Sequence, residues 1–307
     1  MATRPKTAQP LVSVILATFN AGSFLRTCIA SILKQSLEDY ELIIVDDGST
    51  DQSHKIVEGF TDRRIKYFCL PENCGVAQAR NFGLMMASGD YIAVMDSDDQ
   101  AHPRRLERQV AYLNSRPRIG IVGSHVIKAV KSRHILMKYV DNDAIIKARL
   151  LALNGSALIH PSTMIRHKTL RDLYINYPGT KTDEDHHMWF LAAKRGINFG
   201  VVEEPLLIYR RHGKNITSEG SLDAKAHQAR KGPLRTEILS HFFPNASRTA
   251  LKQVANLFGI NRIRNKKFFY GSEFSDFYKT IDKQSSVLGE SRTELKKIIN
   301  WALRRHF

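Results

Sequence analysis

The sequence places three carboxylates within four residues, Asp96-Ser97-Asp98-Asp99, directly after an apolar run. Like charges this close repel one another unless a cation or hydrogen-bond donors neutralise them. Hard divalent cations such as Mg²⁺ and Mn²⁺ prefer oxygen ligands, and phosphates and water commonly complete the coordination of Mg²⁺. The segment therefore indicates a site for a metal ion and a diphosphate. The alternative is a solvated turn that caps the helix expected after Pro103.

A second acidic segment, Asp46-Asp47-Gly48-Ser49-Thr50-Asp51, follows another apolar run. A carboxylate at the end of a strand can accept hydrogen bonds from a nucleobase imide or a ribose. The alternative is a turn in which Ser49 caps the next helix and Gln52 completes a capping box. Both interpretations place the segment at a junction between a strand and a helix.

A third acidic segment, Lys181-Thr182-Asp183-Glu184-Asp185, opens an apolar helix. One of its carboxylates can project into a cleft as a general base. Alternatively, Thr182 and Asp185 form a capping box, since they have its spacing and acidic residues suit a helix N-terminus. His186 and His187 follow, but adjacent side chains on a helix point in different directions and do not make a metal-binding pair.

Basic residues gather toward the end of the chain. The formal net charge is +16, and residues 210–307 hold 20 Lys and Arg against 8 Asp and Glu, whereas residues 1–209 hold 26 against 22. Such an excess can meet nucleic acid, an anionic membrane or a phosphorylated acceptor, and charge alone does not choose among them. Tyr209-Arg210-Arg211-His212 is either a basic rim or a group of donors for phosphate.

Short apolar runs alternate with helical patterns in the first half of the chain, and these elements must position the acidic segments. The predicted strands cover residues 12–16, 41–45, 65–70, 91–95 and 119–126. The predicted helices cover residues 23–35, 52–60, 76–86 and 104–114. This alternation is typical of βαβ units and predicts an α/β fold, with a mainly parallel sheet flanked by helices. Ligands bind beyond the carboxyl ends of such strands, where two of the acidic segments fall.

The second half of the chain is less regular. We predict helices over residues 141–153 and 183–195, and strands over residues 162–166, 199–202 and 206–210. After about Gly220 the pattern becomes helical and basic, which indicates an appended helical region.

Composition excludes several classes of protein. With 43% hydrophobic residues and a mean hydropathy of −0.29, the 307-residue chain is expected to be globular rather than disordered or fibrous. Cys28, Cys69 and Cys74 are an odd number without metal-type spacing, which disfavours a disulfide framework and a structural zinc site. No apolar run approaches the roughly 18 residues that a membrane-spanning helix needs. These features favour a cytoplasmic protein.

Taken together, the motifs resemble those of inverting glycosyltransferases of family 2, which have the GT-A fold. The motifs occur in the family's order, and their joint occurrence carries the resemblance because each alone is weak. They are Leu11 to Asn20, Ile44 to Asp51, Asn73 to Gly83, Gly89 to Asp99, Glu184-Asp185 with Trp189, and Tyr209 to His212.

The resemblance implies that Ala17, Thr18 and Asn20 line a nucleotide pocket and that Asp47 pairs with a uracil ring. The family often has proline where this chain has Ala17, so one wall of the pocket departs from the usual pattern. The expected donor is therefore a UDP-sugar.

The resemblance also assigns residues to the diphosphate and the metal. Arg80 and Asn81 would lie near the nucleotide and the diphosphate, and Asp96 would hold the ribose or the donor sugar. Asp98 would bind Mn²⁺ or Mg²⁺, and His212 would reach the metal or the diphosphate.

By the same resemblance Asp185 would be the catalytic base, because the second acid of the family's Glu-Asp pair usually has that role. It would take the proton of an acceptor hydroxyl while a cation on Asp98 stabilises the charge on the leaving diphosphate. A single displacement inverts the anomeric centre and needs no covalent nucleophile. His187 stands where an acid is common in the family, so acceptor contacts there do not carry over.

The expected domains are a GT-A catalytic domain over residues 1–220 and a basic helical C-terminal region over residues 221–307. Within the first, about residues 11–126 would bind the nucleotide and about residues 127–220 the acceptor.

A more specific resemblance is to bacterial lipooligosaccharide and lipopolysaccharide glycosyltransferases that add N-acetylglucosamine or galactose. It rests on His160-Pro161-Ser162-Thr163-Met164 ahead of the Glu-Asp helix, and on Tyr209 and His212. His160 would contact the donor or acceptor, or alternatively would be a packed, hydrogen-bonded histidine. The expected function is metal-dependent transfer of a sugar to a hydroxyl of a glycan or lipid-linked acceptor in bacterial surface polysaccharide synthesis.

Other functions fit fewer residues. A non-catalytic protein that binds nucleic acid or anionic lipid through its basic C-terminal region explains the charge but not the acidic segments, and those segments disfavour nucleic acid as a partner. A nicotinamide dehydrogenase would show G-x-G-x-x-G after the first strand, and a sugar nucleotidyltransferase would show a glycine-rich phosphate loop there. Neither motif is present.

The last helical segment, residues 291–307, predicts peripheral attachment to the anionic inner face of the cell membrane. Leu295, Ile298, Ile299 and Ala302 fall on one helical face, and the basic residues lie largely off it. The alternative is that this face packs on the catalytic domain and the charges are solvated.

Overall fold

The computed structural model of the protein describes residues 9–151, 157–178, 183–213, 234–257, 272–283 and 291–306. The chain divides into two compact units. Unit 1 comprises the chain up to Asp141 and Leu158–Arg211, and unit 2 comprises Asn142–Ala157 and the chain from His212 onward. Thr182, predicted as a helix cap, and residues 152–153, at the end of a predicted helix, lie outside the described residues.

Unit 1 is built on a parallel sheet. β1 (Val12–Thr18) lies between β2 (Tyr40–Asp46) and β4 (Tyr91–Asp96), and β3 (Ile65–Cys69) pairs with β2. β1 and β2 are almost continuous runs of buried apolar residues. This pattern suits a parallel strand, because helices place apolar side chains against both of its faces.

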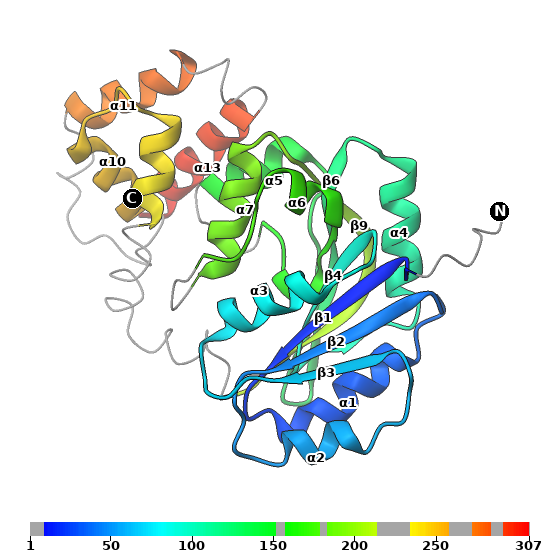
Figure 1. The fold of residues 1–307 in the computed structure, drawn as a ribbon. Helices are drawn as coiled ribbons and strands as arrows, with labels where there is room; N and C mark the ends of the chain where they lie inside the picture. Colours follow the sequence, from blue (N-terminus) through cyan, green and yellow to red (C-terminus); the bar gives the residue numbers. More distant parts are fainter. Residues whose placement is uncertain are drawn as a thin grey trace. The chain divides into compact units, whose positions relative to one another are not determined.

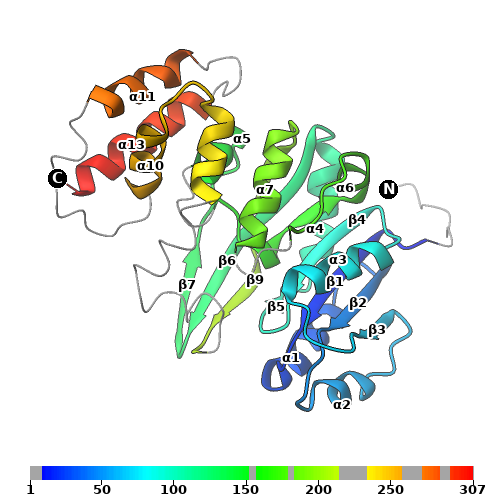
Figure 2. The ribbon, with the colours of Figure 1, turned by 60° about the vertical axis from the view of Figure 1, so that its left-hand side comes forward.

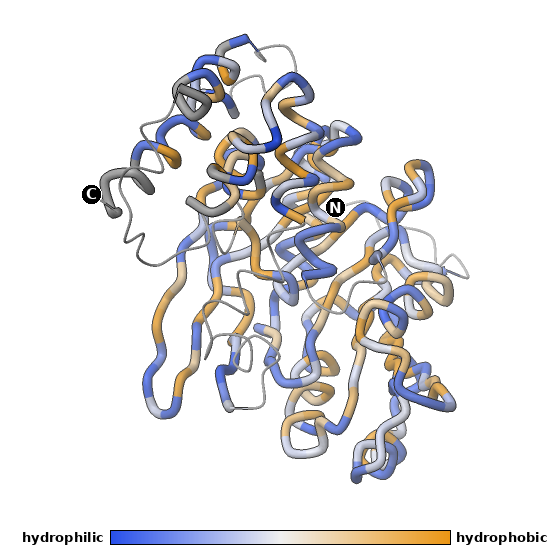
Figure 3. The backbone as a smooth tube through the Cα atoms, turned by 90° about the vertical axis from the view of Figure 1, so that its left-hand side faces the viewer, coloured by the Kyte–Doolittle hydropathy of each residue, from blue (hydrophilic) through white to orange (hydrophobic). Residues whose placement is uncertain are grey.

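Helices cover both faces of this sheet. Figure 1 shows α1 (Gly22–Leu33) and α2 (Ser53–Glu58) on one face and α3 (Val76–Met86) on the other. The buried residues of α1 have the spacing of an amphipathic helix, being Leu25, Cys28, Ile29 and Ile32. Figure 3 shows the corresponding alternation of hydrophobic and hydrophilic residues along the helices.

The sheet continues with antiparallel and mixed pairings. β8 (Met164–Arg166) pairs antiparallel with β4 and with β6 (Ile119–Val130), and β6 pairs in parallel with the long strand β9 (Asn198–Arg211). β5 (Gln100–Ala101) pairs with β9, and β7 (Arg133–Met137) pairs with β6. The order across the sheet is β3-β2-β1-β4-β8-β6-β9-β5. β9 therefore runs beside the residues that directly follow the Asp96 cluster.

The remaining helices of unit 1 connect these strands. They are α4 (Arg105–Ser115), the 3₁₀ turn η1 (His160–Ser162), α6 (His167–Asp172) and α7 (Glu184–Lys194). The buried guanidinium of Arg105 donates from Nη2 to the carbonyl oxygens of Val94 and Thr163. This contact ties α4 to β4 and to the segment before β8.

Unit 2 is helical. Its described helices are α5 (Asp143–Leu151), residues 234–242, α10 (Arg248–Leu257), α11 (Ser272–Lys283) and α13 (Ser291–His306). α13 packs against α5, α10 and α11, and Leu295 and Ile299 are fully buried. Leu295 and Ile299 of the apolar face predicted for the last helix are thus buried within unit 2. Figure 2 labels α5, α10, α11 and α13 of this unit. Among the described residues, no helix has the length and hydrophobicity to cross a membrane.

Several expectations differ from the structure. The strands predicted over residues 199–202 and 206–210 are one strand, β9, with register shifts against β6. The structure also contains β5, β7 and α6, which the sequence analysis does not predict. Ser49 does not cap α2, because its hydroxyl instead accepts a hydrogen bond from the Asn20 amide. The Asp96 cluster does not cap α4, which begins after Arg104 without a side-chain cap.

A close approach between β1 and the turn before β4 generates a test of this packing. A Cβ at Gly89 would lie 2.6 Å from the Ser13 backbone nitrogen, so Gly89→Ala forces the backbone to move. We expect the free energy of unfolding to fall by about 1–3 kcal/mol, the usual cost of overpacking. Gly213→Ala is the control, because a Cβ there meets nothing within 4 Å. Equal urea midpoints for the two variants would contradict this account.

Candidate active site

The carboxyl ends of the parallel strands bring the sequence motifs together. In the sheet register Thr18 lies opposite Asp46, and Ala17 lies opposite Asp96. The ends of β1, β2 and β4 therefore form one row at the same edge of the sheet, the edge where ligands bind in open α/β sheets.

Asp47 fixes the start of α3. Its Oδ1 accepts a hydrogen bond from the amide of Cys74 at 2.8 Å, and its Oδ2 accepts one from the amide of Gly75 at 2.9 Å. Gly75 has φ +91°, a conformation that favours glycine, and it is the residue before α3. The buried carboxylate thus joins the end of β2 to the start of α3 and holds a defined orientation.

Residues at and just after the end of β1 bind the loop between β2 and α2. Asn20 accepts hydrogen bonds at Oδ1 from the amides of Thr50 and Asp51. The hydroxyl of Thr18 is buried and has no hydrogen-bond partner within the described part of the chain. Ala17 packs against the apolar cluster between β2 and α3. The Thr18 hydroxyl is therefore a buried polar atom near the strand ends without a partner in the described part of the chain.

Arg80 bridges β4 and α7. Its Nη2 donates to Asp96 Oδ1 at 2.7 Å and its Nη1 donates to Glu184 Oε1 at 2.5 Å, while its side chain is only 7% exposed. Burial alone would lower the pKa of Arg80, but the neighbouring carboxylates outweigh it and raise the pKa. Burial raises the pKa of Glu184, and the charge of Arg80 opposes that rise. The guanidinium therefore stays charged and holds the two carboxylates in place.

Asn81, the next residue, binds the segment that leads to α7. Its Nδ2 donates to the Tyr177 carbonyl at 2.7 Å, and its Oδ1 accepts from the Tyr177 amide at 2.8 Å. The guanidinium of Arg80 lies 5.5 Å from the centre of the Tyr177 ring. α3 thus positions β4, the segment at Tyr177 and the start of α7 through two adjacent residues.

The acidic cluster after β4 is tied to β9. Ligand atoms of Asp96, Asp98 and Asp99 lie within 4.8 Å of one another. Asp99 Oδ1 accepts a hydrogen bond from the backbone amide of Arg210 at 2.9 Å, and the Arg210 side chain donates to the Asp98 and Asp99 carbonyls. Burial, with the charges of Asp96 and Asp98, raises the pKa of Asp99. Arg210 thus has a structural role at this cluster.

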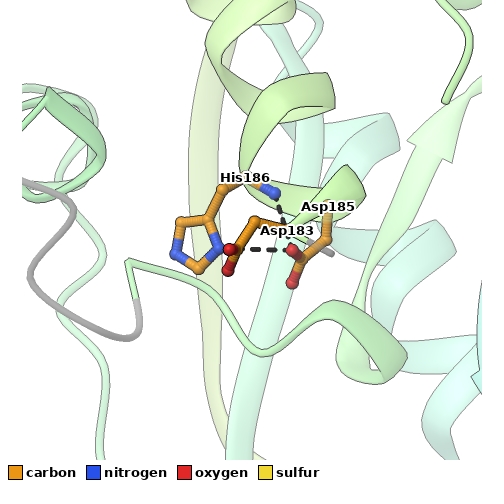
Figure 4. A group of neighbouring side chains, drawn as sticks. All are labelled: Asp183, Asp185 and His186. Carbon is orange, nitrogen blue, oxygen red and sulfur yellow. Dashed lines mark hydrogen bonds and ion pairs between the residues drawn. The ribbon is translucent and has the colours of Figure 1, made fainter. Parts of the chain in front are cut away.

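Asp185 lies in the first turn of α7 beside Asp183 and His186 (Figure 4). Its Oδ1 accepts hydrogen bonds from the His186 amide at 2.7 Å and from His186 Nδ1 at 3.2 Å when that nitrogen carries a proton. Burial alone would raise the pKa of Asp185, but His186 outweighs it and holds the pKa well below its usual value. Asp185 is therefore ionised at neutral pH.

His160 packs beneath this group. Its Nε2 lies 2.9 Å from the Tyr177 hydroxyl, and its ring lies against the rings of Tyr177 and Trp189. Burial, aided by the charge of Arg80, lowers the pKa of His160 to about 3. The imidazole is therefore neutral at physiological pH, and these contacts are those of the packed, hydrogen-bonded alternative.

His212 directly follows β9, two residues beyond Arg210. The structure also shows contacts that the sequence did not predict, namely Glu184 as the partner of Arg80 and Tyr177 as the partner of Asn81 and His160. No local pattern could reveal the first pair, because 104 positions separate its members.

A scan against protein families matches residues 13–174 to the model described as Glycosyl transferase family 2. Among curated proteins, an uncharacterized glycosyltransferase of Methanocaldococcus jannaschii is 30% identical over 66% of this chain and 71% of its own length. The Escherichia coli protein named UDP-Glc:alpha-D-GlcNAc-diphosphoundecaprenol beta-1,3-glucosyltransferase WfgD is 32% identical over 62% of this chain and 75% of its own.

Solved structures share the fold. S. aureus TarS 1-349 in complex with UDP-GlcNAc matches 96% of this chain and 87% of its own with a TM-score of 0.65, at 18% identity. The mannosyltransferase PcManGT from Pyrobaculum calidifontis, in complex with GDP-Man and Mn²⁺, matches 97% of this chain and 86% of its own with a TM-score of 0.56, at 16% identity.

The bridge by Arg80 generates a stability prediction. Arg80→Met leaves the carboxylates of Asp96 and Glu184 without their shared cation, so we expect the free energy of unfolding to fall by about 3–5 kcal/mol. Arg104→Met is the matched control, because its ion pair with Glu107 is exposed and is worth about 0–1 kcal/mol. Urea denaturation measures both, and equal losses would contradict the bridging role.

Proposed function

The chain belongs to glycosyltransferase family 2 and has the GT-A type of α/β fold, and from this premise we propose that it transfers a sugar from a UDP-sugar to an acceptor hydroxyl. The observation that carries the proposal is the arrangement at one sheet edge. The ends of β1 and β2 lie there beside the carboxylate cluster after β4, and Arg80 links Asp96 of that cluster to Glu184 at the start of α7, next to Asp185.

The ends of β1 and β2 form the nucleotide end of the proposed site. Thr18 offers its buried hydroxyl, Ala17 and Asn20 shape the wall, and Asp47 receives the uracil ring through the lone pairs that its two backbone contacts leave free. The UDP-GlcNAc named for the S. aureus structure supports uracil as the base.

In this proposal Arg80 and Asn81 lie near the diphosphate and donor sugar and position other residues of the site. Both are already engaged, Arg80 with Asp96 and Asn81 with Tyr177, so they orient the groups that touch the donor. Asp96 holds the ribose or the sugar with the carboxylate oxygen that Arg80 does not bind.

The residues after β4 fit a divalent cation. Asp96, Asp98 and Asp99 supply hard oxygen ligands close together, and Asp99 Oδ2 is buried without a hydrogen-bond partner in the described ranges. We assign the metal to Asp98, and the Mn²⁺ named for the Pyrobaculum calidifontis structure supports Mn²⁺ or Mg²⁺. When bound, the cation supplies positive charge against the leaving diphosphate.

Asp185 is the proposed base. Its carboxylate is ionised, and its hydrogen bonds from His186 fix its orientation on α7. It accepts the proton of the acceptor hydroxyl as the oxygen attacks the anomeric carbon, and the single displacement inverts that carbon.

The proposed substrates and location follow the relatives. From the motif resemblance we propose N-acetylglucosamine or galactose as the donor sugar, and a glycan or a lipid-linked glycan of bacterial surface polysaccharide synthesis as the acceptor. The name of the E. coli relative, whose donor is UDP-Glc, supports the lipid-linked acceptor and not the choice of donor sugar. The enzyme would then work at the inner face of the cell membrane. In this proposal residues 1–220 form the catalytic domain and residues 221–307 the basic C-terminal region.

A donor screen tests the function directly. The protein is incubated with Mn²⁺ and individual UDP-sugars or GDP-sugars, and release of the nucleoside diphosphate is measured with and without a lipid-linked glycan. UDP release from one or two UDP-sugars supports the proposal, and release only from sugars activated with another nucleotide contradicts it.

The metal assignment predicts that Asp98→Asn abolishes transfer and removes the metal-dependent part of UDP binding, because the amide supplies an oxygen but no charge. Titration calorimetry with UDP, with Mn²⁺ and with a chelator, measures the effect. Asp39→Asn is the control, since Asp39 precedes β2 at the opposite end of that strand. Unchanged metal dependence in the Asp98 variant would place the cation elsewhere.

The base assignment predicts that Asp185→Asn retains the fold and UDP binding but lowers kcat by roughly 10²- to 10⁴-fold, the usual contribution of a positioned proton acceptor. Asp183→Asn is a matched control in the same cluster, because Asn tolerates its left-handed conformation at φ +63°. If both variants lose turnover equally, or neither does, Asp185 is not the base.

A further inference from the structure

The hairpin of β6 and β7 forms an exposed edge of unit 1. Its paired part runs from Val126 to Met137, and among the described strands β7 pairs with β6 alone. Residues 131–136 are all exposed, including Ile135 at 48% and Leu136 at 47%. Figure 2 shows β7 at the side of β6 that faces away from β9.

This hairpin is strongly basic. The sequence contains no Asp or Glu between Glu107 and Asp141, while the hairpin and the two residues after it carry four Lys and Arg, namely Lys128, Lys131, Arg133 and Lys138. None of the four forms an ion pair with a carboxylate of the described chain. Their charge is therefore available to an anionic partner.

Apolar and basic side chains are interleaved on the hairpin. The antiparallel register places Ile135 opposite Lys128 and Leu136 opposite Ile127, so each face of the hairpin carries one half-exposed large apolar side chain. Val140, just beyond the hairpin, is also exposed. A polyanion in water would satisfy the charges but leave these apolar groups in water. An anionic lipid surface satisfies both, because headgroups attract Lys and Arg while the interface takes up Ile and Leu.

The hairpin is also continuous with the candidate active site. β6 pairs with β9 as far as Val130 and Arg211, and Ala129 lies opposite Arg210, which binds Asp98 and Asp99. A surface held by the hairpin therefore has a fixed relation to the carboxylate cluster within unit 1.

We propose that the β6–β7 hairpin, through Lys128, Lys131, Arg133 and Lys138 with Ile135 and Leu136, docks unit 1 on an anionic lipid surface. The proposal deepens the proposed function and rests on it for the presence of a lipid-linked acceptor. It differs from attachment by the C-terminal region, since the apolar face of α13 is already covered by α5 within unit 2.

Vesicle sedimentation of the full-length chain tests the proposal. Vesicles of phosphatidylglycerol and phosphatidylcholine in equal parts are compared with vesicles of phosphatidylcholine alone, at low and high salt and without donor sugar. Two hairpin variants are used, Lys131→Gln with Arg133→Gln, and Ile135→Ser with Leu136→Ser. The matched controls are Lys279→Gln with Lys297→Gln in unit 2, and Met85→Ser on α3, all at exposed positions.

We expect the wild type to sediment with the anionic vesicles alone and to be released by salt. The charge variant should bind about tenfold more weakly or worse, the apolar variant should also bind more weakly, and the controls should match the wild type. Hairpin variants that bind like the wild type, or a greater loss in the Lys279 and Lys297 variant, would overturn the proposal. So would binding of an oligonucleotide through the hairpin in place of vesicles. Because no donor is present, failure of the transferase assay leaves this result unaffected.

Discussion

The ion pairs of Arg80 are the contact on which the candidate site depends. Asp96 ends a central strand and Glu184 begins α7, and the two carboxylates lie close enough to share one buried guanidinium. Two such charges in a poorly solvated place would repel each other, and Asp98 beside Asp96 and Asp185 beside Glu184 add to that repulsion. The guanidinium of Arg80 therefore allows the acidic end of β4 and the acidic start of α7 to lie close together. It can do so only because α3 holds Arg80 in position.

α3 is itself held at several points. Asp47 binds the amides before its first turn, and Asn81 binds both backbone groups of Tyr177. The helix packs on β1 so closely that a Cβ at Gly83 would lie 2.6 Å from Ile15. Three elements of the site thus take their positions from one helix, and residues that a motif would assign to ligand binding contribute here by positioning others.

Adjacent carboxylates on α7 have opposite electrostatic surroundings. Burial raises the pKa of Glu184, whereas hydrogen bonds and charge from His186 lower that of Asp185. Environments that separate the pKa values of neighbouring acids give them different roles. Glu184 is a structural partner of Arg80, whereas the Asp185 carboxylate is bound by His186. The two segments that combine basic and apolar residues also differ in their surroundings. The apolar face of α13 is buried in unit 2, whereas the β6–β7 hairpin exposes its apolar side chains among Lys and Arg.

The sequence alone determined the α/β class, the bounds of α3, most strands of the parallel sheet and the family, because each depends on local periodicity and on motifs that are contiguous in the chain. It also placed Asp47 and Asp96 just after predicted strands, because the acidic segments directly follow apolar runs. It left two interpretations open for His160 and Asp185, and it missed β5, β7, Tyr177 and the pairing of Glu184 with Arg80. Those features depend on contacts across many positions, such as the 104 between Arg80 and Glu184. Only the folded chain decides them, because a side chain's burial and charged neighbours, which set its pKa and its hydrogen bonds, exist only after distant segments have packed together.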